Sequence, residues 1–447
     1  MKNRPRVLHL FIVLNLLLFL APQTPTARAQ SESSLSQRIQ KVMSRPEFAH
    51  ANFGIEFYSL DAGEVIYALN ADKLFVPAST TKTLTEGTLL AKLGADYRFH
   101  TRVYRTGPID KHGTLKGDLI LVASGDPNLS NRIQPDGTLA FVDHDHSYNG
   151  PALPGDPLAV IQEFVSQIKS KGVRKIEGHV YVDTTLMPDS EREGGTGVVM
   201  SSIIVNDNVI DLVGKPGSKP DDAVQLSVSP QNSYLHFVNN LVTGEPKSKL
   251  AFSASDPVPA PDGSLTVTLS GSIPMGMEPQ MAAFAVPSPT KFATAALGDL
   301  LKSAGIPVNA KAASPVTDFT PYQRFYTAEN QLAEHVSPPL SEEIKITLKV
   351  SQNLHAGMGP YLLGLLVAKD VKDPIHAGFK TERAFLQEAK LDLSGAAQGD
   401  GAGGDWADLF SPDFIVHYMI YWTTRPDYDV FFKGLPCLLY TSPSPRD

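Results

Sequence analysis

The chain has 447 residues, more than one ordinary hydrophobic core requires, so two or three domains are expected. Hydrophobic residues make up 42% of the chain and charged residues 19%, which is the balance of a globular protein. The net charge of -8 argues against a nucleic-acid partner and against a basic membrane-binding surface. The single cysteine, Cys437, excludes an intrachain disulfide.

The first 29 residues have the order of a secretory signal peptide. Three basic residues precede an apolar run at 7–20, and the small-residue site Ala27-Arg28-Ala29 follows. This run is shorter than a membrane-spanning helix. We therefore expect a signal peptide at 1–29, cleavage after Ala29 and export to the periplasm or cell-wall space. No stable membrane span is expected after cleavage, and a retained N-terminal anchor is the alternative.

The next elements follow from the hydrophobic pattern. Residues 31–50 have the spacing of a polar amphipathic helix. Strand-like runs at 53–60 and 64–69 are separated by Asp61-Ala62-Gly63, which predicts a hairpin. After Pro77, apolar residues recur at helical spacing until Gly94, so a helix follows the hairpin.

The middle of the chain has a different character. From about residue 99 to 290, short apolar runs alternate with Gly, Pro, Asp and Ser, which predicts sheets with many turns. A helix-like segment at 157–171 interrupts them, and helical patterns return at 291–304 and 340–368.

Ser79 and Lys82 form a Ser-x-x-Lys motif at the expected start of the first long helix. Residues three apart share one helix face, so the lysine amine can reach the serine hydroxyl. Serine is a weak nucleophile until a base takes its proton, and a desolvated lysine can do this. The spacing recurs at Ser166 and Ser288 without the same flanking elements. The alternative for residues 79–81 is a hydroxyl-rich helix N-cap.

Ser351 and Asn353 form a second motif within the 340–368 segment. A hydroxyl at this place can pass a proton to a leaving amine, and a carboxamide can hold a substrate carbonyl. Ser147 and Asn149 have the same spacing in an expected loop, and a polar helix junction is the alternative for Ser351.

Together, Ser-x-x-Lys and Ser-x-Asn are typical of penicillin-binding proteins and class A β-lactamases. Residues 76–82 and 348–356 resemble the first two motifs of the peptidase S13 family, the class C low-molecular-mass penicillin-binding proteins, and 400–403 resembles its Asp-Gly-Ser-Gly turn. The 272 positions between Ser79 and Ser351 are similar to the inserted domains of that family. The resemblance runs from about residue 35 to 436.

The resemblance implies an α/β (α+β) fold. Its catalytic part is a transpeptidase domain like that of penicillin-binding proteins and β-lactamases, an antiparallel sheet with helices on both sides. Two mostly-β inserted domains split it. We expect the split DD-peptidase domain at 31–98 and 291–436 and the inserted domains at 99–290, with their mutual boundary left open.

The resemblance also implies a serine-type D-alanyl-D-alanine carboxypeptidase/endopeptidase acting on peptidoglycan stem peptides. Ser79 would be the nucleophile and Lys82 its base, with Ser351 and Asn353 serving proton transfer and substrate placement. Penicillin and other β-lactams would acylate the same serine, and no metal or other cofactor is implied. In relatives an inserted acidic residue contacts the diaminopimelic amine. Asp183 is the candidate here, with a turn-capping aspartate as the alternative.

The third motif of the family, Lys-Thr-Gly or Lys-Ser-Gly, is absent from the sequence. The string at 105–107 (Arg-Thr-Gly) precedes the inserted strands, and the string at 380–382 (Lys-Thr-Glu) lacks the glycine. Residues 437–447 do not resemble the family and look like translated adapter sequence. We therefore expect native protein to end at about Pro436 in this sequence, and the 447-residue chain to be inactive.

Two rival functions stay open. One is a β-lactamase or esterase on the same core, which the long insertion disfavours. The other is a non-catalytic scaffold that binds the cell wall and lacks the third motif. Separately, His144 and His146 in the segment 142–155 have a spacing that metal ligands can use, although an exposed loop explains them better.

Overall fold

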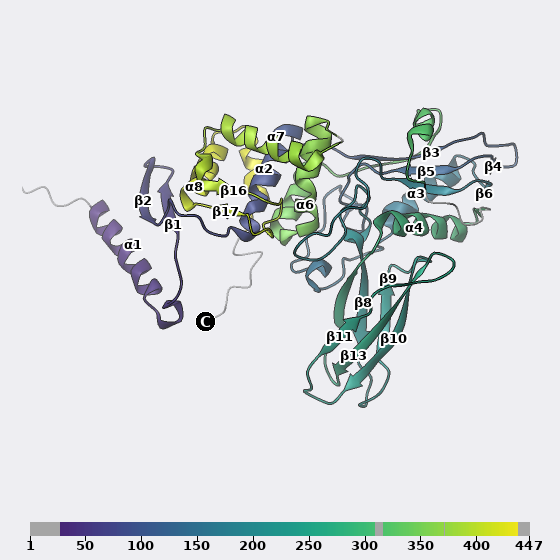
Figure 1. Ribbon diagram of the computed structural model, residues 1–447, viewed down its shortest axis with the longest axis horizontal. Helices are drawn as coiled ribbons and strands as arrows, with labels where there is room; N and C mark the ends of the chain where they lie inside the picture. Colours follow the sequence, from purple (N-terminus) through teal and green to yellow (C-terminus); the bar gives the residue numbers. More distant parts are fainter. Residues whose placement is uncertain (1–26, 309–315, 371, 437–447) are drawn as a thin grey trace, which may run out of the picture.

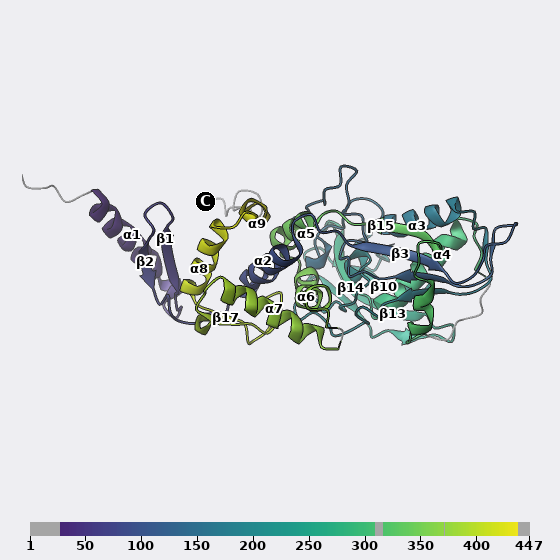
Figure 2. The ribbon, with the colours of Figure 1, turned by 90° about the horizontal axis from the view of Figure 1, so that it is seen from above.

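The computed structural model describes residues 27–308, 316–370 and 372–436. This part is elongated: a helix and hairpin lie at one end, helices lie in the middle, and the inserted sheets lie at the other end (Figures 1 and 2). Within these ranges, no helix combines the length and apolar character needed to cross a membrane. Most of the expected signal peptide and all of 437–447 lie outside the described residues.

The N-terminal end consists of helix α1 (Ala27–Met43) and a hairpin of strands β1 (Ile55–Ser59) and β2 (Glu64–Leu69). The two strands pair antiparallel. Gly63 lies in the turn with a φ of 68°, a left-handed conformation that glycine adopts without steric cost. The hairpin predicted from the alternating runs is confirmed.

The central helical region combines segments from both sides of the insertion. Leu84 and Leu90 of α2 (Lys82–Leu93) are fully buried in a core that includes Trp422 and Phe431. At Gly87 a Cβ would lie 2.1 Å from Tyr418 Oη, so only glycine allows this close packing. The other elements are α5 (Leu340–Ile346), the π-helical turns η6 (Thr347–Ser351) and η7 (Leu363–Ala368), α6 (Asn353–Leu362), α7 (Pro374–Glu388), α8 (Pro412–Thr423), α9 (Tyr428–Gly434), and the paired strands β16 (Ala396–Ala397) and β17 (Leu409–Phe410).

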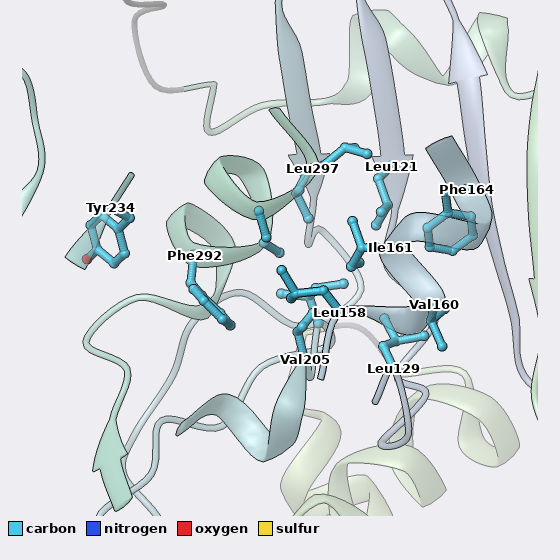
Figure 3. Packing of buried hydrophobic residues seen from close by; sticks show 14 of the residues in the cluster. Leu121, Leu129, Leu158, Val160, Ile161, Phe164, Val205, Tyr234, Phe292 and Leu297 are labelled. Carbon is cyan, nitrogen blue, oxygen red and sulfur yellow. The ribbon is translucent and has the colours of Figure 1, made fainter. Parts of the chain in front are cut away.

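The first inserted unit is a four-stranded sheet with two helices packed against it and against each other. In Figure 3, Leu121 of the sheet lies near Ile161 of one helix and Leu297 of the other, and Phe164 and Phe292 belong to the same core. In spatial order the strands are β15 (Gln331–Val336), β3 (His100–Arg105), β5 (Leu119–Val122) and β7 (Val180–Asp183), with only β5 and β7 parallel. The helices are α3 (Ala159–Ser170) and α4 (Pro289–Ser303), and β4 (Thr114–Leu115) pairs with β6 (Lys175–Ile176) at one side.

The packing of α4 and β15 bears on where the second segment of the split domain begins. Strand β15 and all but the first two residues of helix α4 lie within the predicted second segment, yet both elements belong to the core of the inserted unit, and Val336 pairs with His100 of β3. An amphipathic helix can bury its apolar face in either domain, so the pattern alone could not assign α4. We therefore propose 99–336 for the insertion and 337–436 for the second catalytic segment.

The second inserted unit is all β and projects from the first (Figure 1). One sheet has the order β14-β8-β9, and the other has β10, β13 and β11 with β12 added to β13. Leu212 in the first sheet and Leu269 in the second are buried in one core with the α/β unit. The strands are β8 (Val209–Lys215), β9 (Gln225–Ser229), β10 (Leu235–Gly244), β11 (Ala251–Ala254), β12 (Val258–Pro259), β13 (Leu265–Pro274) and β14 (Gln280–Ala285).

Candidate active site

Ser79 and Lys82 meet at the N-terminal end of α2. The residues before the helix form a 3₁₀ turn, η2 (Ala78–Thr81), and α2 continues from Lys82. Lys82 Nζ lies 2.9 Å from Ser79 Oγ, the contact that the three-residue spacing predicts. Ser79 is exposed, whereas Lys82 is 1% exposed. An accessible hydroxyl therefore lies in front of a buried amine.

Ser351 and Asn353 join this pair from the other side of the insertion. Ser351 Oγ donates to Ser79 Oγ at 2.8 Å, and Lys82 Nζ donates to Asn353 Oδ1 at 2.7 Å. The predicted helix at 340–368 is interrupted here, because Ser351 has a φ of 64° and α6 begins anew at Asn353. The two motifs thus form one cluster.

The surroundings of the Lys82 amine supply three acceptors. Besides the oxygens of Ser79 and Asn353, the carbonyl oxygen of Ala402 accepts from Nζ at 2.8 Å. Burial lowers the pKa of Lys82 to about 8, although the carboxylates of Glu193, Asp400 and Glu86 act to raise it. The neutral amine is therefore accessible near neutral pH.

The turn at 400–403 brings the Ala402 carbonyl to the lysine. Asp400 Oδ1 accepts from the backbone N–H groups of Ala402 at 2.8 Å and Gly403 at 2.5 Å. Gly403 has a φ of 90°, and a Cβ there would lie 1.9 Å from the carbonyl oxygen of Ala78. The family resemblance identified the turn, but a main-chain acceptor has no side-chain signal in the sequence.

Asp183 is placed differently from the other predicted site residues. It lies at the end of β7, where its carboxylate accepts from Thr185 N at 2.8 Å and from Tyr326 Oη at 2.5 Å. The contact with Thr185 is that of an aspartate capping a turn, which agrees with the alternative expected from the sequence.

Glu193 is an acidic residue that sequence reasoning missed. Its carboxylate accepts from Gly195 N and Thr196 N, both at 2.6 Å, and so shapes a loop. This loop lies against the second motif, because a Cβ at Gly195 would be 2.2 Å from Asn353 Nδ2. The segment carries no recognisable pattern, so only its place in the fold reveals it.

The other copies of the motifs have partners of their own. Ser166 Oγ donates to the carbonyl of Gln162 at 2.9 Å, and Ser288 Oγ donates to Asp189 at 2.6 Å. Ser147 Oγ donates to the carboxylate of Asp145 at 2.5 Å. The string at 105–107 follows β3 in the inserted unit, and the string at 380–382 lies within helix α7.

His144 and His146 do not form a pair. His144 is exposed, whereas His146 is buried and its two ring nitrogens lie 2.8 Å from Asp211 and 2.9 Å from Asp207. Elsewhere in the described part, the ligand atoms of Glu56, Asp413 and His417 lie within 4.8 Å of one another. These residues belong to β1 and α8, and exposed carboxylates often gather without a metal.

A Ser-x-x-Lys pair completed by a Ser-x-Asn segment, on an α/β fold with inserted sheets, defines the class of penicillin-binding proteins and β-lactamases. Within that class, the chain belongs to the D-Ala-D-Ala carboxypeptidase 3 (S13) family, whose model matches residues 35–437.

Similar proteins carry related names. The chain is 23% identical over 414 residues to a D-alanyl-D-alanine carboxypeptidase of Actinomadura sp. (strain R39), covering 90% of this chain and 70% of that protein. It is 22% identical over 418 residues to the D-alanyl-D-alanine carboxypeptidase DacB of Haemophilus influenzae, covering 90% and 76%. The crystal structure of penicillin binding protein 4 from Haemophilus influenzae, complexed with a β-lactam, matches with a TM-score of 0.67 at 20% identity, covering 93% and 82%. This structural likeness confirms the predicted fold class.

Proposed function

We propose that this protein is a serine-type D-Ala-D-Ala carboxypeptidase/endopeptidase that acts on peptidoglycan stem peptides. Ser79 forms the acyl-enzyme, and β-lactams acylate the same residue. The observation that carries this proposal is the position of Lys82 Nζ between Ser79 Oγ, Asn353 Oδ1 and the Ala402 carbonyl. Family membership and the names of the relatives support the substrate class.

The three acceptors explain how Lys82 can serve as a base. A neutral amine has two N–H groups and one lone pair. The carbonyl oxygens of Asn353 and Ala402 can only accept, so they retain the two N–H groups in either charge state. The lone pair then faces Ser79 Oγ, the one partner that has a proton to give.

The reaction follows from these contacts. Ser79 Oγ bonds to the carbonyl carbon between the two terminal D-alanines, and its proton passes to Lys82 Nζ. Ser351 Oγ, 2.8 Å from Ser79 Oγ, relays a proton to the nitrogen of the leaving D-alanine as the C–N bond breaks. Water then attacks the ester, releases the shortened peptide and returns the proton to Ser79.

Substrate placement is assigned to the second motif and its neighbouring loop. The Asn353 carboxamide uses its oxygen for Lys82, which leaves its N–H groups to meet a substrate carbonyl. For the contact with a substrate amine, Asp183 was the candidate from the sequence. The Glu193 loop touches Asn353, and the Glu193 carboxylate raises the pKa of Lys82, so we assign Glu193 an electrostatic effect on the site.

The location follows from the substrate. Peptidoglycan lies outside the cytoplasmic membrane, so the proposed reaction requires export. The signal peptide predicted at 1–29 supports a place in the periplasm or cell-wall space. Stem peptides are the proposed partners, and β-lactams the proposed inhibitors.

Acylation by a fluorescent penicillin tests the function. In the product of the gene as read from genomic DNA, we expect one label per chain, located on the peptide that contains Ser79 by mass spectrometry, and no label in Ser79→Ala. Ser166→Ala is the matched control, because it removes another Ser-x-x-Lys serine that bonds only within α3. A peptide ending in D-alanyl-D-alanine should lose its last residue with the same dependence on Ser79.

The rival functions give different results in the same assay. A β-lactamase or esterase would release hydrolysed penicillin rapidly and leave little stable label. A scaffold would take no label at all. Because the printed sequence has no Lys-Thr-Gly string, the 447-residue chain is assayed beside the product of the gene as read from genomic DNA. Labelling of the 447-residue chain itself would contradict its expected inactivity.

A further inference from the structure

A buried group of charged side chains lies behind the segment from Ser351 to Asn353. Its centre is Asp207, which is 1% exposed. Oδ2 of Asp207 accepts from Arg132 Nη2 at 2.6 Å and from His146 Nε2 at 2.9 Å, both in the inserted unit. The same carboxylate therefore has two cationic partners on the insertion side.

On its other side, Asp207 binds the catalytic segment. Gln352 Nε2 donates to Asp207 Oδ2 at 3.1 Å, and His355 Nε2 lies 3.1 Å from Oδ1. These two residues flank Asn353 in the sequence and are themselves buried. One carboxylate thus joins the insertion to the middle residue of the second motif and to a residue that follows the motif.

The backbone holds Asp207 in a rarely used conformation. Asn206, Asp207 and Asn208 all have left-handed φ values, of 51°, 51° and 54°. Asn206 Nδ2 donates to Val209 O at 3.0 Å, and Asn208 Oδ1 accepts from Val205 N at 3.1 Å. A turn of this kind persists only when its surroundings fix it, and such turns gather at functional sites. It gives the carboxylate a single direction.

Gln352 connects the fixed carboxylate of Asp207 to the active-site segment. Its Oε1 accepts from Leu354 N at 3.1 Å and so caps α6, while its Nε2 is held by Asp207. Ser351 before it has a left-handed φ of 64°. With both ends of the Gln352 carboxamide fixed, the backbone that directs Ser351 and Asn353 is fixed as well.

We propose that Asp207 is a positioning residue for acyl transfer, which holds Gln352 and His355 so that Ser351 and Asn353 meet Ser79 and Lys82. This inference rests on the proposed function of Ser79. It makes the insertion a part of the active site, because Arg132 and His146 of the insertion hold the same carboxylate.

The charges in the cluster agree with this role. Burial by itself lowers the pKa of both histidines, but neighbouring carboxylates raise it to about 10 for His355 and about 9 for His146. Both are therefore cations at neutral pH. His355 Nδ1 also lies 2.9 Å from Glu343 Oε1. Without the charge of Asp207, Arg132 and the two histidines lose their common partner and must rearrange.

The test compares Asp207→Asn with Asp211→Asn. Asp211 is a matched control, because it is 4% exposed and lies 2.8 Å from His146 Nδ1 in the same cluster, but its contact is with the insertion side. We expect the rate constant for penicillin acylation of Ser79 to fall about 10- to 100-fold in Asp207→Asn. In Asp211→Asn it should stay within about threefold of the unmodified protein, with rates normalised to the folded fraction.

A second readout separates this proposal from the proposed function. The titration of Lys82, followed by NMR of its labelled Cε, does not require acylation. Its midpoint should move in Asp207→Asn, because displaced Asn353 no longer accepts from Nζ, and stay in place in Asp211→Asn. If the product of the gene as read from genomic DNA takes no penicillin, the proposed function fails, and this titration still decides the role of Asp207.

If Asp207→Asn does not fold, Gln352→Glu replaces it. This variant keeps an oxygen to cap α6 but removes the N–H that Asp207 accepts. It should show the same loss of acylation and the same shift of Lys82. Normal acylation together with an unchanged Lys82 midpoint, in either variant, would overturn the proposal.

Discussion

At the active-site serine, two effects act in opposite directions on the proton of Lys82. Burial favours the neutral amine and lowers its pKa to about 8, whereas nearby carboxylates favour the ammonium form. The carbonyl oxygens of Asn353 and Ala402 accept hydrogen bonds from both forms. A lysine can therefore release its proton without losing its position. An arginine cannot, because its guanidinium stays charged throughout this range.

Acylation should accordingly depend on pH. Because the neutral amine is the base, the rate of penicillin acylation should rise with pH and level off above about 8. Lys82→Arg should reduce the rate by about 10²- to 10⁴-fold, the usual contribution of a general base. Rates measured from pH 6 to 10 with a fluorescent penicillin check both expectations.

Variants of two acidic residues test whether the pH dependence of acylation comes from Lys82. The Glu193 carboxylate raises the pKa of Lys82, so Glu193→Gln should move the midpoint to lower pH. Asp183→Asn should leave the midpoint in place, since its partners are Thr185 and Tyr326. A rate that is constant between pH 6 and 9 in the unmodified protein would rule out Lys82 as the titrating base.

At the scale of elements, local sequence patterns predicted some parts of the fold and the site but not others. The hairpin, helix α2 and the contact between Ser79 and Lys82 follow from alternation, helical spacing and the three-residue rule. The sequence could not show that Ala402 contributes its carbonyl, because every residue has one. Nor could it place Glu193, which reaches the site only through the packing of its loop.

The turn that carries Ala402 should be sensitive to a single methyl group. In Gly403→Ala, the new Cβ would collide with the Ala78 carbonyl and favour a different φ. We expect a loss of about 1–3 kcal/mol in the free energy of unfolding. Acylation of Ser79 should fall as well, because the turn supports the Lys82 amine. Denaturant melts and penicillin labelling measure the two effects.

A second glycine gives the opposite expectation. Gly298 lies inside α4, and a Cβ there would meet nothing within 4 Å. Gly298→Ala should stabilise the protein by about 0.5–1 kcal/mol and leave acylation unchanged. If Gly298→Ala lost as much stability and acylation as Gly403→Ala, the close approach of Gly403 to the Ala78 carbonyl would not be the cause of the loss.

For the molecule as a whole, the sequence predicted a split catalytic part with a β-rich insertion, and the packing changed its limits. The region at 99–290 contains an α/β unit and an all-β unit. The pairing of β15 with β3 could not be predicted from the sequence, because two strands so far apart along the chain leave no local pattern. For the same reason the helical pattern could not show that α4 packs in the core of the inserted unit.

The buried charges should make the stability of the whole protein depend on pH. The pKa values of His146 and His355 are about 9 and about 10, above the value of about 6.5 in an unfolded chain. Their stabilising contribution is complete below about pH 6.5 and is lost as pH rises through 9 to 10. Melting temperatures measured from pH 6 to 10 should therefore fall at the alkaline end.

Variants isolate this contribution from that of other groups. His355→Gln should lower the melting temperature at pH 6 and flatten its decline at higher pH. His112→Gln is the control, since His112 is exposed, and it should reproduce the unmodified curve. Lys82 acts in the opposite direction above pH 8, because its pKa is lowered, so the comparison between variants is the decisive one.

The pairing of β3 with β15 also bears on how the chain folds. Ser79 and Ser351 are 272 positions apart, and the ends of the insertion meet where His100 lies opposite Val336. Once the insertion has folded, it brings α2 and α5 to neighbouring positions. The two motifs then meet as a local event, without the entropy cost of ordering a long flexible loop.

An order of assembly follows. We expect the insertion to form first, because α2 packs in one core with helices that follow the insertion in the sequence. Until those helices pack against it, part of the apolar face of α2 stays uncovered, a condition that favours aggregation. The chain is therefore most prone to aggregate in the interval before these helices pack against α2. Chaperones that bind apolar segments would act in that interval.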